Sequence, residues 1–289
     1  MTSDASSPPA SRIIPSPEEL GFDFLATKAR YAKERDKRLR KDGNDQYVEA
    51  ADELAHYVED PYVEGRLERA PLSEEVDVLI VGGGFAGLMA GARLREGGVQ
   101  KIRIIESAGD FGGTWYWNRY PGAQCDIESY IYMPLLEELD TIPTEKYAHG
   151  PEILAHAQAI GRHYDLYDGA CFQTNVAGLE WNDVSHRWTV RTDRDDEIRA
   201  RFVILANGPL NKPKLPGIPG VETFEGHSFH TSRWDYDYTG GDTTGGLDRL
   251  KDKRVGVIGT GATAIQCIPH LGRDARAVSY THLRAHETT

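Results

Sequence analysis

Short apolar runs that lead into glycine-rich turns organise the hydrophobic pattern of the chain. Val76–Val81 is a mostly β-branched and aliphatic run typical of a buried parallel strand, and it continues directly into GGGFAG at 82–87. Leu88–Arg95 has helix-forming composition, and Ile102–Ile105 predicts a second strand that ends at Glu106. This order of strand, glycines, helix and strand predicts one βαβ unit.

A second start of the same architecture lies near the other end of the chain. Arg254–Ile258 predicts a strand and leads into GTGATA at 259–264, which is followed by another helical stretch. Between the two starts, Trp188–Arg191 and Arg201–Leu205 predict strands of a β-rich segment, and Pro209–Pro219 is a proline-rich connection. The pattern therefore predicts an α/β protein with a complete and a second, partial Rossmann-like dinucleotide-binding domain.

The first 72 residues do not follow this pattern. Residues 1–15 are rich in Ser, Pro and Ala and predict a disordered tail. Ser16 is placed to cap a charged helix that runs toward Arg40, and Tyr47–Val58 predicts a second helix. Residues 16–72 are therefore expected to form a solvated helical extension that packs on the main domain or on a partner subunit.

Composition narrows the functions that the chain is expected to have. A length of 289 residues suggests about two domains, and the net charge of −12 argues against a nucleic acid as partner. The sequence contains no run of 18 apolar residues, and its N-terminus lacks the basic start and apolar centre of a secretory signal. We therefore expect a cytoplasmic protein that does not associate with a membrane.

The first glycine loop fits the dinucleotide-binding fingerprint G-x-G-x-x-G. In this fingerprint Gly82 permits the turn, Gly84 lets the backbone approach a pyrophosphate, and Gly87 lets helix and strand pack closely. An acid at the end of the second strand, here Glu106, accepts hydrogen bonds from ribose hydroxyls. The cofactor-binding residues expected at this loop are Gly82, Gly84, Phe85, Ala86, Gly87 and Glu106.

The second glycine loop has the variant form G-x-G-x-x-A. Its expected cofactor-binding residues are Gly259, Thr260, Gly261, Ala262, Thr263 and Ala264. Two such loops imply two dinucleotides, and the simplest chemistry is hydride transfer from a nicotinamide to a flavin. The acid that closes the first unit favours FAD at the first loop and the nicotinamide cofactor at the second. The alternative is a single Rossmann domain with a fortuitous second loop.

The cysteines argue against one class of enzyme with this arrangement. Disulfide reductases need two closely spaced cysteines beside the flavin, whereas Cys125, Cys171 and Cys267 are far apart in the sequence and form no zinc-type cluster. We therefore expect reduced thiols, no bound metal, and molecular oxygen as the acceptor of the flavin's electrons.

Two further motifs carry a resemblance to a known family. Residues 113–126 match G-x-W-x-x-x-x-[F/Y]-P-G-x-x-x-D, and residues 224–235 match F-x-G-x-x-x-H-x-x-x-W-[P/D] through Phe224, Gly226, His230, Trp234 and Asp235. Over about residues 75–269 the chain resembles the Baeyer–Villiger monooxygenases, near the phenylacetone and cyclohexanone monooxygenase branches. Its N-terminal arm is similar to that of relatives that accept large cyclic or steroid ketones.

The resemblance implies an FAD- and NADPH-dependent enzyme that uses O2 to insert one oxygen atom next to a ketone carbonyl, giving an ester or lactone. It also implies that the cofactor is bound by Gly113, Thr114, Trp115, Tyr120 and Asp126. In the family, the aspartate that matches Asp126 positions an arginine beside the flavin, so Asp126 is the expected catalytic residue. The alternative is that Asp126 caps a helix that begins near Ile127.

Two assignments in these motifs have competing interpretations. His230 is either a general base or, because the motif connects the two nucleotide domains in the family, a residue that acts with Trp234 in domain coupling and closure. The second interpretation is favoured. A group of four aromatic side chains either packs in the core or contacts the cofactor, and it comprises Trp115, Tyr116, Trp117 and Tyr120.

The end of the chain departs from the sequence expected of a Rossmann domain. Residues 278–288 resemble the translation of a transposase-adapter read used in sequencing libraries, which predicts that the native reading frame ends near Ala277. His282 and His286, which have the spacing of a helical metal pair, then belong to a non-native tail. The expected domains are an FAD-binding domain at 73–220, a linker and the start of an NADP-binding domain at 221–277, and a tail at 278–289.

On this interpretation the chain is an incomplete fragment, and we expect poor solubility and no turnover from it alone. One alternative is an N- or S-oxygenating flavin-containing monooxygenase, against which Trp234 and Asp235 argue. The other is a catalytically inactive nucleotide-binding protein.

Overall fold

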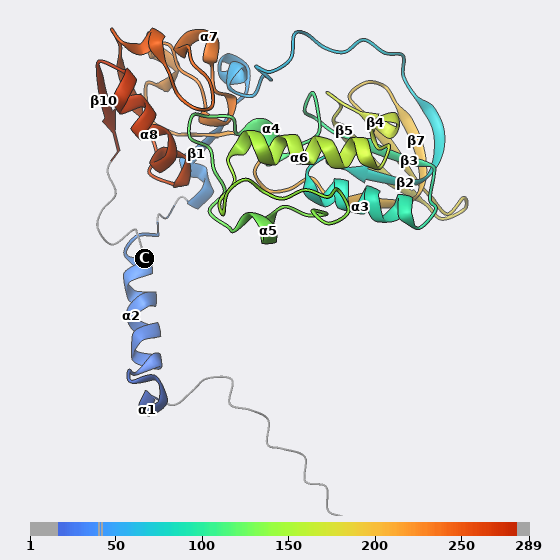
Figure 1. The fold of residues 1–289 in the computed structure, drawn as a ribbon, viewed down its shortest axis with the longest axis horizontal. Coiled ribbons are helices and arrows are strands. Elements are labelled where there is room, and N and C mark those ends of the chain that lie inside the picture. The colour runs from blue at the N-terminus through green and yellow to red at the C-terminus, as the bar shows by residue number, and fades with distance from the viewer. Residues whose placement is uncertain (1–16, 40, 42, 282–289) are drawn as a thin grey trace, which may run out of the picture. The chain divides into compact units, whose positions relative to one another are not determined.

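A computed structural model of the chain describes residues 17–39, 41 and 43–281 (Figure 1). Contacts divide it into two units. Residues up to Val48 with Pro216–Ile218 form the smaller unit, and Glu49–Leu215 with the residues from Pro219 on form the larger one. The tail predicted at 1–15 and the capping residue Ser16 lie outside the described residues.

The smaller unit contains two helices in place of the single helix predicted from its charged sequence. Helix α1 (Pro17–Leu20) ends at Gly21, whose φ is +71°. Helix α2 (Phe24–Asp36) begins after Asp23, whose carboxylate accepts a hydrogen bond from a first-turn amide at 2.9 Å. The prediction of one continuous helix is wrong because Gly21 turns the chain and Asp23 starts a new helix. None of the residues of α2 is buried.

A strand and a 3-10 helix take the place of the helix predicted at Tyr47–Val58. Strand β1 spans Tyr47–Glu49, and the 3-10 helix spans Asp52–Tyr57. Ala51 between them is extended, and Asp52 has a left-handed φ of +50°. The prediction is wrong because this pair of conformations interrupts an α-helix, although the apolar residues have helical spacing.

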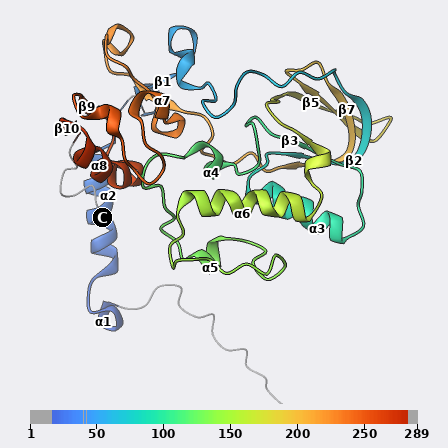
Figure 2. The same ribbon diagram turned by 45° about the horizontal axis from the view of Figure 1, so that its top comes forward.

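The larger unit is built on a six-stranded sheet with the strand order β4-β3-β2-β7-β6-β5. Strands β2, β3, β5 and β7 of this sheet are labelled in Figure 2. The first four strands in this order run in parallel, and β6 and β5 continue the sheet as antiparallel strands. The strands are β2 (Ser73–Val81), β3 (Ile102–Ile105), β4 (Ala170–Cys171), β5 (Val176–Asn182), β6 (Arg187–Thr192) and β7 (Glu197–Leu205). The strands predicted near residues 76, 102, 188 and 201 are thus confirmed.

Two helices, α3 (Phe85–Glu96) and α6 (Gly150–His163), pack side by side on one face of this sheet (Figures 1 and 2). Ile80 of β2 is fully buried in the core beneath them, whereas its neighbour Leu79 is fully buried in the core on the opposite face. This alternation explains why β2 is apolar at nearly every position, since both of its faces are covered.

Helix α6 has a sequence signal that the motif search did not use. A proline stands in its first turn, and Ile153, Ala157 and Ile160 recur at helical spacing and are all fully buried. By contrast, α4 (Thr114–Trp117), α5 (Ser129–Tyr132) and α7 (Tyr236–Thr239) are single turns. Strand β8 (Lys214–Pro216) lies in the proline-rich connection.

The second glycine loop opens a βαβ unit of its own. Strand β9 (Arg254–Val257) is followed by α8 (Ala262–Asp274) and by β10 (Ala277–Tyr280), and β10 pairs in parallel with β9. A strand does follow the helix, in contrast to the sequence expectation, and residues 278–280 of the predicted non-native tail lie in it. Residues 282–289 are outside the described part. Within the described ranges, no helix is long and apolar enough to cross a membrane.

Candidate dinucleotide site

A cavity of about 550 Å³ opens at the carboxyl ends of β2, β3 and β7. Its lining begins at the last residue of each strand, with Val81 of β2, Ile105 of β3 and Leu205 of β7. This is the edge at which open parallel sheets bind ligands. The volume falls in the range of roughly 300–1,000 Å³ that is usual for cofactor and small-molecule pockets.

The first glycine loop forms one wall of the cavity. Gly82 has a φ of +108°, and a Cβ at this position would overlap the carbonyl oxygen of Ala206. A Cβ at Gly87 would in turn overlap the carbonyl oxygen of Gly82, so strand and helix approach as closely as glycine permits. Gly84 and Phe85, at the start of α3, line the cavity together with Ala86.

Glu106 directly follows β3 and lies beside this loop, and only 5% of its surface is exposed. One carboxylate oxygen accepts a hydrogen bond from the amide of Gly83 at 2.5 Å, and the other accepts from the amide of Ala108 at 2.8 Å. The carboxylate is therefore held in place at the edge of the cavity by two backbone donors, which suits a residue that must present an oxygen to a ligand hydroxyl.

The motif at residues 113–126 lies against the first glycine loop. A Cβ at Gly113 would lie 2.7 Å from the Cα of Gly84, so the two backbones are nearly in contact. Gly113, Thr114 and Trp115 line the cavity, as does Trp117. The indole N–H of Trp115 donates to the hydroxyl of Tyr132 at 2.9 Å, which fixes the ring in the wall.

The four aromatic residues of this motif divide between the two interpretations. Trp115 and Trp117 line the cavity, but Tyr116 and Tyr120 are buried elsewhere. The hydroxyl of Tyr116 donates to Asp60 at 2.7 Å, and that of Tyr120 donates to the Gln266 side chain at 2.7 Å. The structure thus gives Tyr120 a contact with α8 and no place in the cavity lining.

Asp126 is also apart from the cavity lining. Its side chain is exposed, three residues before the start of the short helix α5 at Ser129. Glu128, not Asp126, occupies the N-cap position of that helix, and no side-chain capping bond is formed there. The structure therefore does not support the capping alternative, and the catalytic assignment of Asp126 stays a prediction.

Several lining residues were not found by sequence reasoning. Residues 174–176 follow β4, residues 206–208 follow β7, and Asn211 comes from the proline-rich connection. The second group directly follows a predicted strand, but the sequence did not indicate that this strand, β7, runs parallel to β2 and so ends at the ligand edge of the sheet. Strand β4 has only two residues and gave no such signal.

The second glycine loop repeats the backbone of the first. Gly259 has a φ of +122°, and Gly261 has φ and ψ of −77° and −172°, close to the −80° and −175° of Gly84. Ala264 is buried at the position that corresponds to Gly87. A Cβ at Gly259 or Gly261 would meet no atom within 4 Å, so the described residues build no opposing wall here.

The residues of the motif at 224–235 lie at the junction with the βαβ unit formed by β9, α8 and β10. Trp234 is 2% exposed and packs in a core with Tyr120, Cys267 and Leu271. This core joins the motif at 113–126, which contains Tyr120, to α8, which contains Cys267 and Leu271. Asp235 caps α7 by accepting a hydrogen bond from a backbone amide at 2.8 Å, and its carboxylate also contacts the His227 ring nitrogen at 2.8 Å.

The other members of the motif have different environments. The His230 side chain accepts a hydrogen bond from the amide of Ser232 at 3.1 Å, and burial followed by the charge of Arg233 lowers its pKa. Phe224 is 64% exposed, and its ring lies directly against Gly226. His230 is therefore poised as a neutral acceptor that caps a turn, and it is not among the residues that line the cavity.

Arg233, within this motif, connects it to the cavity wall. Its guanidinium lies 3.5 Å from the centroid of the Trp117 ring and donates to the carbonyl of Asn211 at 3.2 Å, and both of these residues line the cavity. Burial lowers the pKa of Arg233 to about 10. No sequence signal singled out Arg233, because it stands at a variable position of the motif.

The three cysteines are free and buried, and each belongs to a different core. Cys125 packs near Trp115. Cys171, in β4, packs in the same core as Leu79, and Cys267 packs in the core of α8. Burial raises the pKa of all three thiols. The arrangement provides no redox-active cysteine pair, as the sequence predicted.

Comparison with known proteins gives the class of this fold and site. A family model described as pyridine nucleotide-disulphide oxidoreductase matches residues 79–284. The match begins within β2 and extends through the second glycine loop, so both loops belong to this class.

Individual relatives narrow the class. Neopentalenolactone D synthase of Streptomyces avermitilis is 61% identical over 254 residues, which cover 88% of this chain and 43% of that protein. A Baeyer–Villiger monooxygenase of Streptomyces coelicolor is 53% identical over 259 residues, or 89% of this chain and 43% of the relative. The structure of a polycyclic ketone monooxygenase from Thermothelomyces thermophila matches with a TM-score of 0.81 and 41% identity, over 91% of this chain and 45% of that one.

The chain belongs to the Baeyer–Villiger monooxygenase family. It spans less than half the length of these relatives.

Proposed function

We propose that the cavity at the end of the parallel strands binds FAD. The close approach of Gly82, Gly87 and Gly113 leaves room for a pyrophosphate beside the N-terminus of α3, whose free amides and partial positive charge suit phosphate. The fixed carboxylate of Glu106 is placed for a ribose hydroxyl. When bound, FAD would supply the chemistry that accepts a hydride and activates O2.

The second glycine loop is proposed to bind NADPH. The backbone conformations shared by Gly259 and Gly261 with the first loop support a dinucleotide there. Solved relatives point to the same pair of cofactors, since one structure is titled a steroid monooxygenase bound to NADP and another a complex with FAD and NADP.

The reaction proposed for the protein is Baeyer–Villiger oxidation, in which one oxygen atom of O2 is inserted next to a ketone carbonyl to give an ester or lactone. The observation that carries this proposal is the buried Trp234 with the capping Asp235, the pair that the N- and S-oxygenating enzymes lack in this motif. Trp234 packs with Tyr120 and with α8 of the second βαβ unit, and Arg233 lies over Trp117 in the cavity wall. These two contacts support a role of the motif in domain coupling.

The substrate class that we propose is a large cyclic or polycyclic ketone. The polycyclic ketone monooxygenase matches 91% of the chain, whereas a cyclohexanone monooxygenase in the open form matches 73%. A steroid monooxygenase matches 71%, so the additional match supports a likeness to the polycyclic ketone monooxygenase in particular. Asp126 is retained as the proposed positioning residue for a flavin-side arginine.

The experiment is an assay of the 289-residue chain and of the complete gene product with FAD, NADPH, O2 and a polycyclic ketone. Ketone-dependent NADPH consumption with a lactone product supports the proposal. Formation of only N-oxides or sulfoxides would instead identify the related monooxygenase class. A yellow protein that oxidises none of these compounds would identify a nucleotide-binding protein without the proposed activity.

A further inference from the structure

A loop that follows the very short strand β4 forms one end of the cavity. Thr174, Asn175 and Val176 line the cavity, and β4 has only two residues with which to anchor them. Two backbone hydrogen bonds tie this loop to the segment after β3: the Thr174 amide donates to the Glu106 carbonyl at 3.0 Å, and Gln173 donates to Ala108 at 2.9 Å. Further anchoring comes from the turn between β6 and β7, largely through side chains.

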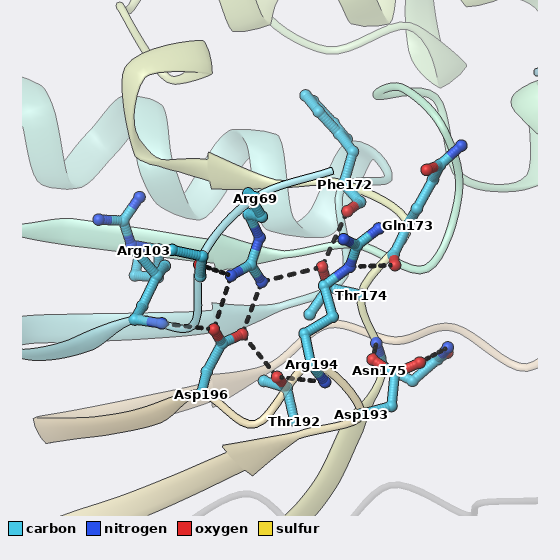
Figure 3. Close-up of polar contacts among 12 residues, drawn as sticks. Arg69, Arg103, Phe172, Gln173, Thr174, Asn175, Thr192, Asp193, Arg194 and Asp196 are labelled. Carbon is cyan, nitrogen blue, oxygen red and sulfur yellow. Dashed lines mark hydrogen bonds and ion pairs between the residues drawn. The ribbon is translucent and has the colours of Figure 1, made fainter. Parts of the chain in front are cut away.

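Asp193, in the turn between β6 and β7, holds Asn175 directly (Figure 3). Its carboxylate accepts from the Asn175 backbone amide at 2.8 Å and from the Asn175 side-chain amide at 3.1 Å. The amide of Asp193 donates back to the Asn175 carbonyl at 2.9 Å, and Arg66 donates to the carboxylate at 3.0 Å. Both the backbone and the side chain of a cavity residue are therefore fixed by one acid.

A second acid in the same turn fixes the turn itself. Asp196 has a fully buried carboxylate that accepts two hydrogen bonds from Arg69, both at 2.6 Å, and one from the Thr192 hydroxyl at 2.5 Å. Arg69 also reaches the Thr174 hydroxyl at 3.3 Å, so the pair connects the turn to the cavity loop (Figure 3). Arg194 adds a hydrogen bond to the Gln173 carbonyl at 3.0 Å.

The position of this loop indicates which part of a dinucleotide it faces. Glu106 marks the place of the adenosine ribose, because the acid at the end of the second strand takes the ribose hydroxyls. The loop lies beside Glu106 at the end of the neighbouring strand β4, on the side away from β2 and its glycines. The loop is thus placed at the side of the proposed site that would hold the adenine, and a flavin ring would lie away from it.

We infer that Asp193 is a positioning residue for the adenylate half of the dinucleotide, acting through Asn175, with Asp196 and Arg69 as the support that holds its turn. This inference rests on the proposed binding of FAD. The turn at residues 193–196 would thereby contribute to binding, although it contains none of the motif residues and does not itself line the cavity.

The test compares Asp193→Ala with Asp193→Asn in the full 289-residue chain. Asp193 is exposed, so neither change is expected to unfold the protein. Alanine removes the two hydrogen bonds that the carboxylate accepts from Asn175 and keeps the backbone one, whereas asparagine also keeps a side-chain oxygen that accepts from the Asn175 amide. Asp195→Asn is the matched control, because Asp195 is an exposed acid of the same turn with a φ of +59°, which asparagine tolerates.

The affinity for FAD is measured by titration, and AMP and FMN are measured as competitors of FAD. We expect D193A to weaken the affinities for FAD and AMP by about tenfold, the factor that corresponds to about 1.4 kcal/mol. The affinity for FMN is expected to stay unchanged. D193N and D195N are expected to stay within about twofold of the wild type. Equal affinity of D193A and the wild type for FAD, or equal weakening of FAD and FMN, overturns the inference. A wild-type chain that binds no FAD overturns the proposed function instead.

Discussion

The carboxylate of Glu106 lies 2.5 Å from the amide of Gly83, so the acid predicted to hold a ribose also fixes the glycine loop. Its other oxygen accepts from the Ala108 amide. One side chain thereby bridges the glycine loop after β2 and the segment after β3, and it couples the shape of the phosphate-binding turn to the ribose position. Loss of Glu106 should therefore affect both folding and cofactor binding.

Replacement of Glu106 by alanine leaves two amides of the loop without their acceptor. We expect E106A to lower the free energy of unfolding by about 2 kcal/mol and to weaken FAD binding at least about tenfold. The stability and FAD affinity of E106Q are expected to lie between those of E106A and the wild type. Glutamine keeps one acceptor oxygen, but its NH2 group places a donor against one of the two backbone N–H groups. Urea unfolding and FAD titration measure both effects. E137Q, at an exposed glutamate, is the control, and an E106A protein with wild-type affinity would contradict the prediction.

The close contact of Gly87 with Gly82 predicts a large effect of a single methyl group. In G87A the added Cβ overlaps the Gly82 carbonyl, so the turn between β2 and α3 must shift. We expect a loss of about 1–3 kcal/mol in the free energy of unfolding, with FAD binding abolished in the titration. G272A is the matched control, because Gly272 is also helical but has open space, and alanine there should stabilise the chain by about 0.5–1 kcal/mol. Similar behaviour of the two variants would refute the packing argument.

The Asp196–Arg69 pair makes stability depend on acid. Burial by itself would raise the pKa of Asp196, but hydrogen bonds from Arg69, Thr192 and a backbone amide outweigh it and lower the pKa to about 2. A lowered carboxyl pKa contributes stability above the ordinary value of 3.8 and loses it as the pH falls toward 2. The contribution is about 2 kcal/mol.

Chemical unfolding at pH 7 and at steps down to pH 2 measures this contribution. We expect D196N to cost about 3 kcal/mol at pH 7, since it leaves Arg69 without its buried partner. The difference between D196N and the wild type should shrink as the pH falls from 4 to 2. D195N is the control, and a difference that does not change with pH would argue against the ion pair as the cause.

The half-buried environment of His230 predicts that its ring is neutral at pH 7. Its pKa lies below the ordinary 6.5, so the folded state loses stability as the pH falls below 6.5, where the unfolded chain takes up the proton first. NMR titration should give a midpoint below 6.5 for His230. H230N keeps an acceptor at this cap and should remove that part of the pH dependence, whereas H186N, at an exposed histidine, should not.

The same variant separates the two roles considered for His230. If His230 couples the domains, H230N in the complete gene product lowers the rate of NADPH-dependent ketone oxidation but keeps the shape of its pH profile. If the acidic limb of the profile disappears in H230N, His230 acts as a base, and the assignment to domain coupling is wrong.

The sequence by itself determined the parts of this protein that depend on neighbours along the chain. The strand, glycine loop and helix at 76–95 were predictable because buried parallel strands are continuously apolar and because the loop needs glycine at fixed positions. The helix predicted at 47–58 does not form, because one left-handed residue, Asp52, overrides the apolar spacing. Motif residues identified the family, but the motif pattern did not separate Trp115, in the cavity wall, from Tyr120, in the core of α8.

Only the tertiary structure decided which distant residues complete the site. Arg69 and Asp196 are 127 positions apart, and their pairing beside Thr174 has no periodicity or motif that would reveal it. Arg233 likewise meets Trp117 only because the connection after β7 returns to the cavity. Contacts of this kind arise when burial forces charged side chains to find partners wherever the fold brings them, so they follow from packing and not from local sequence.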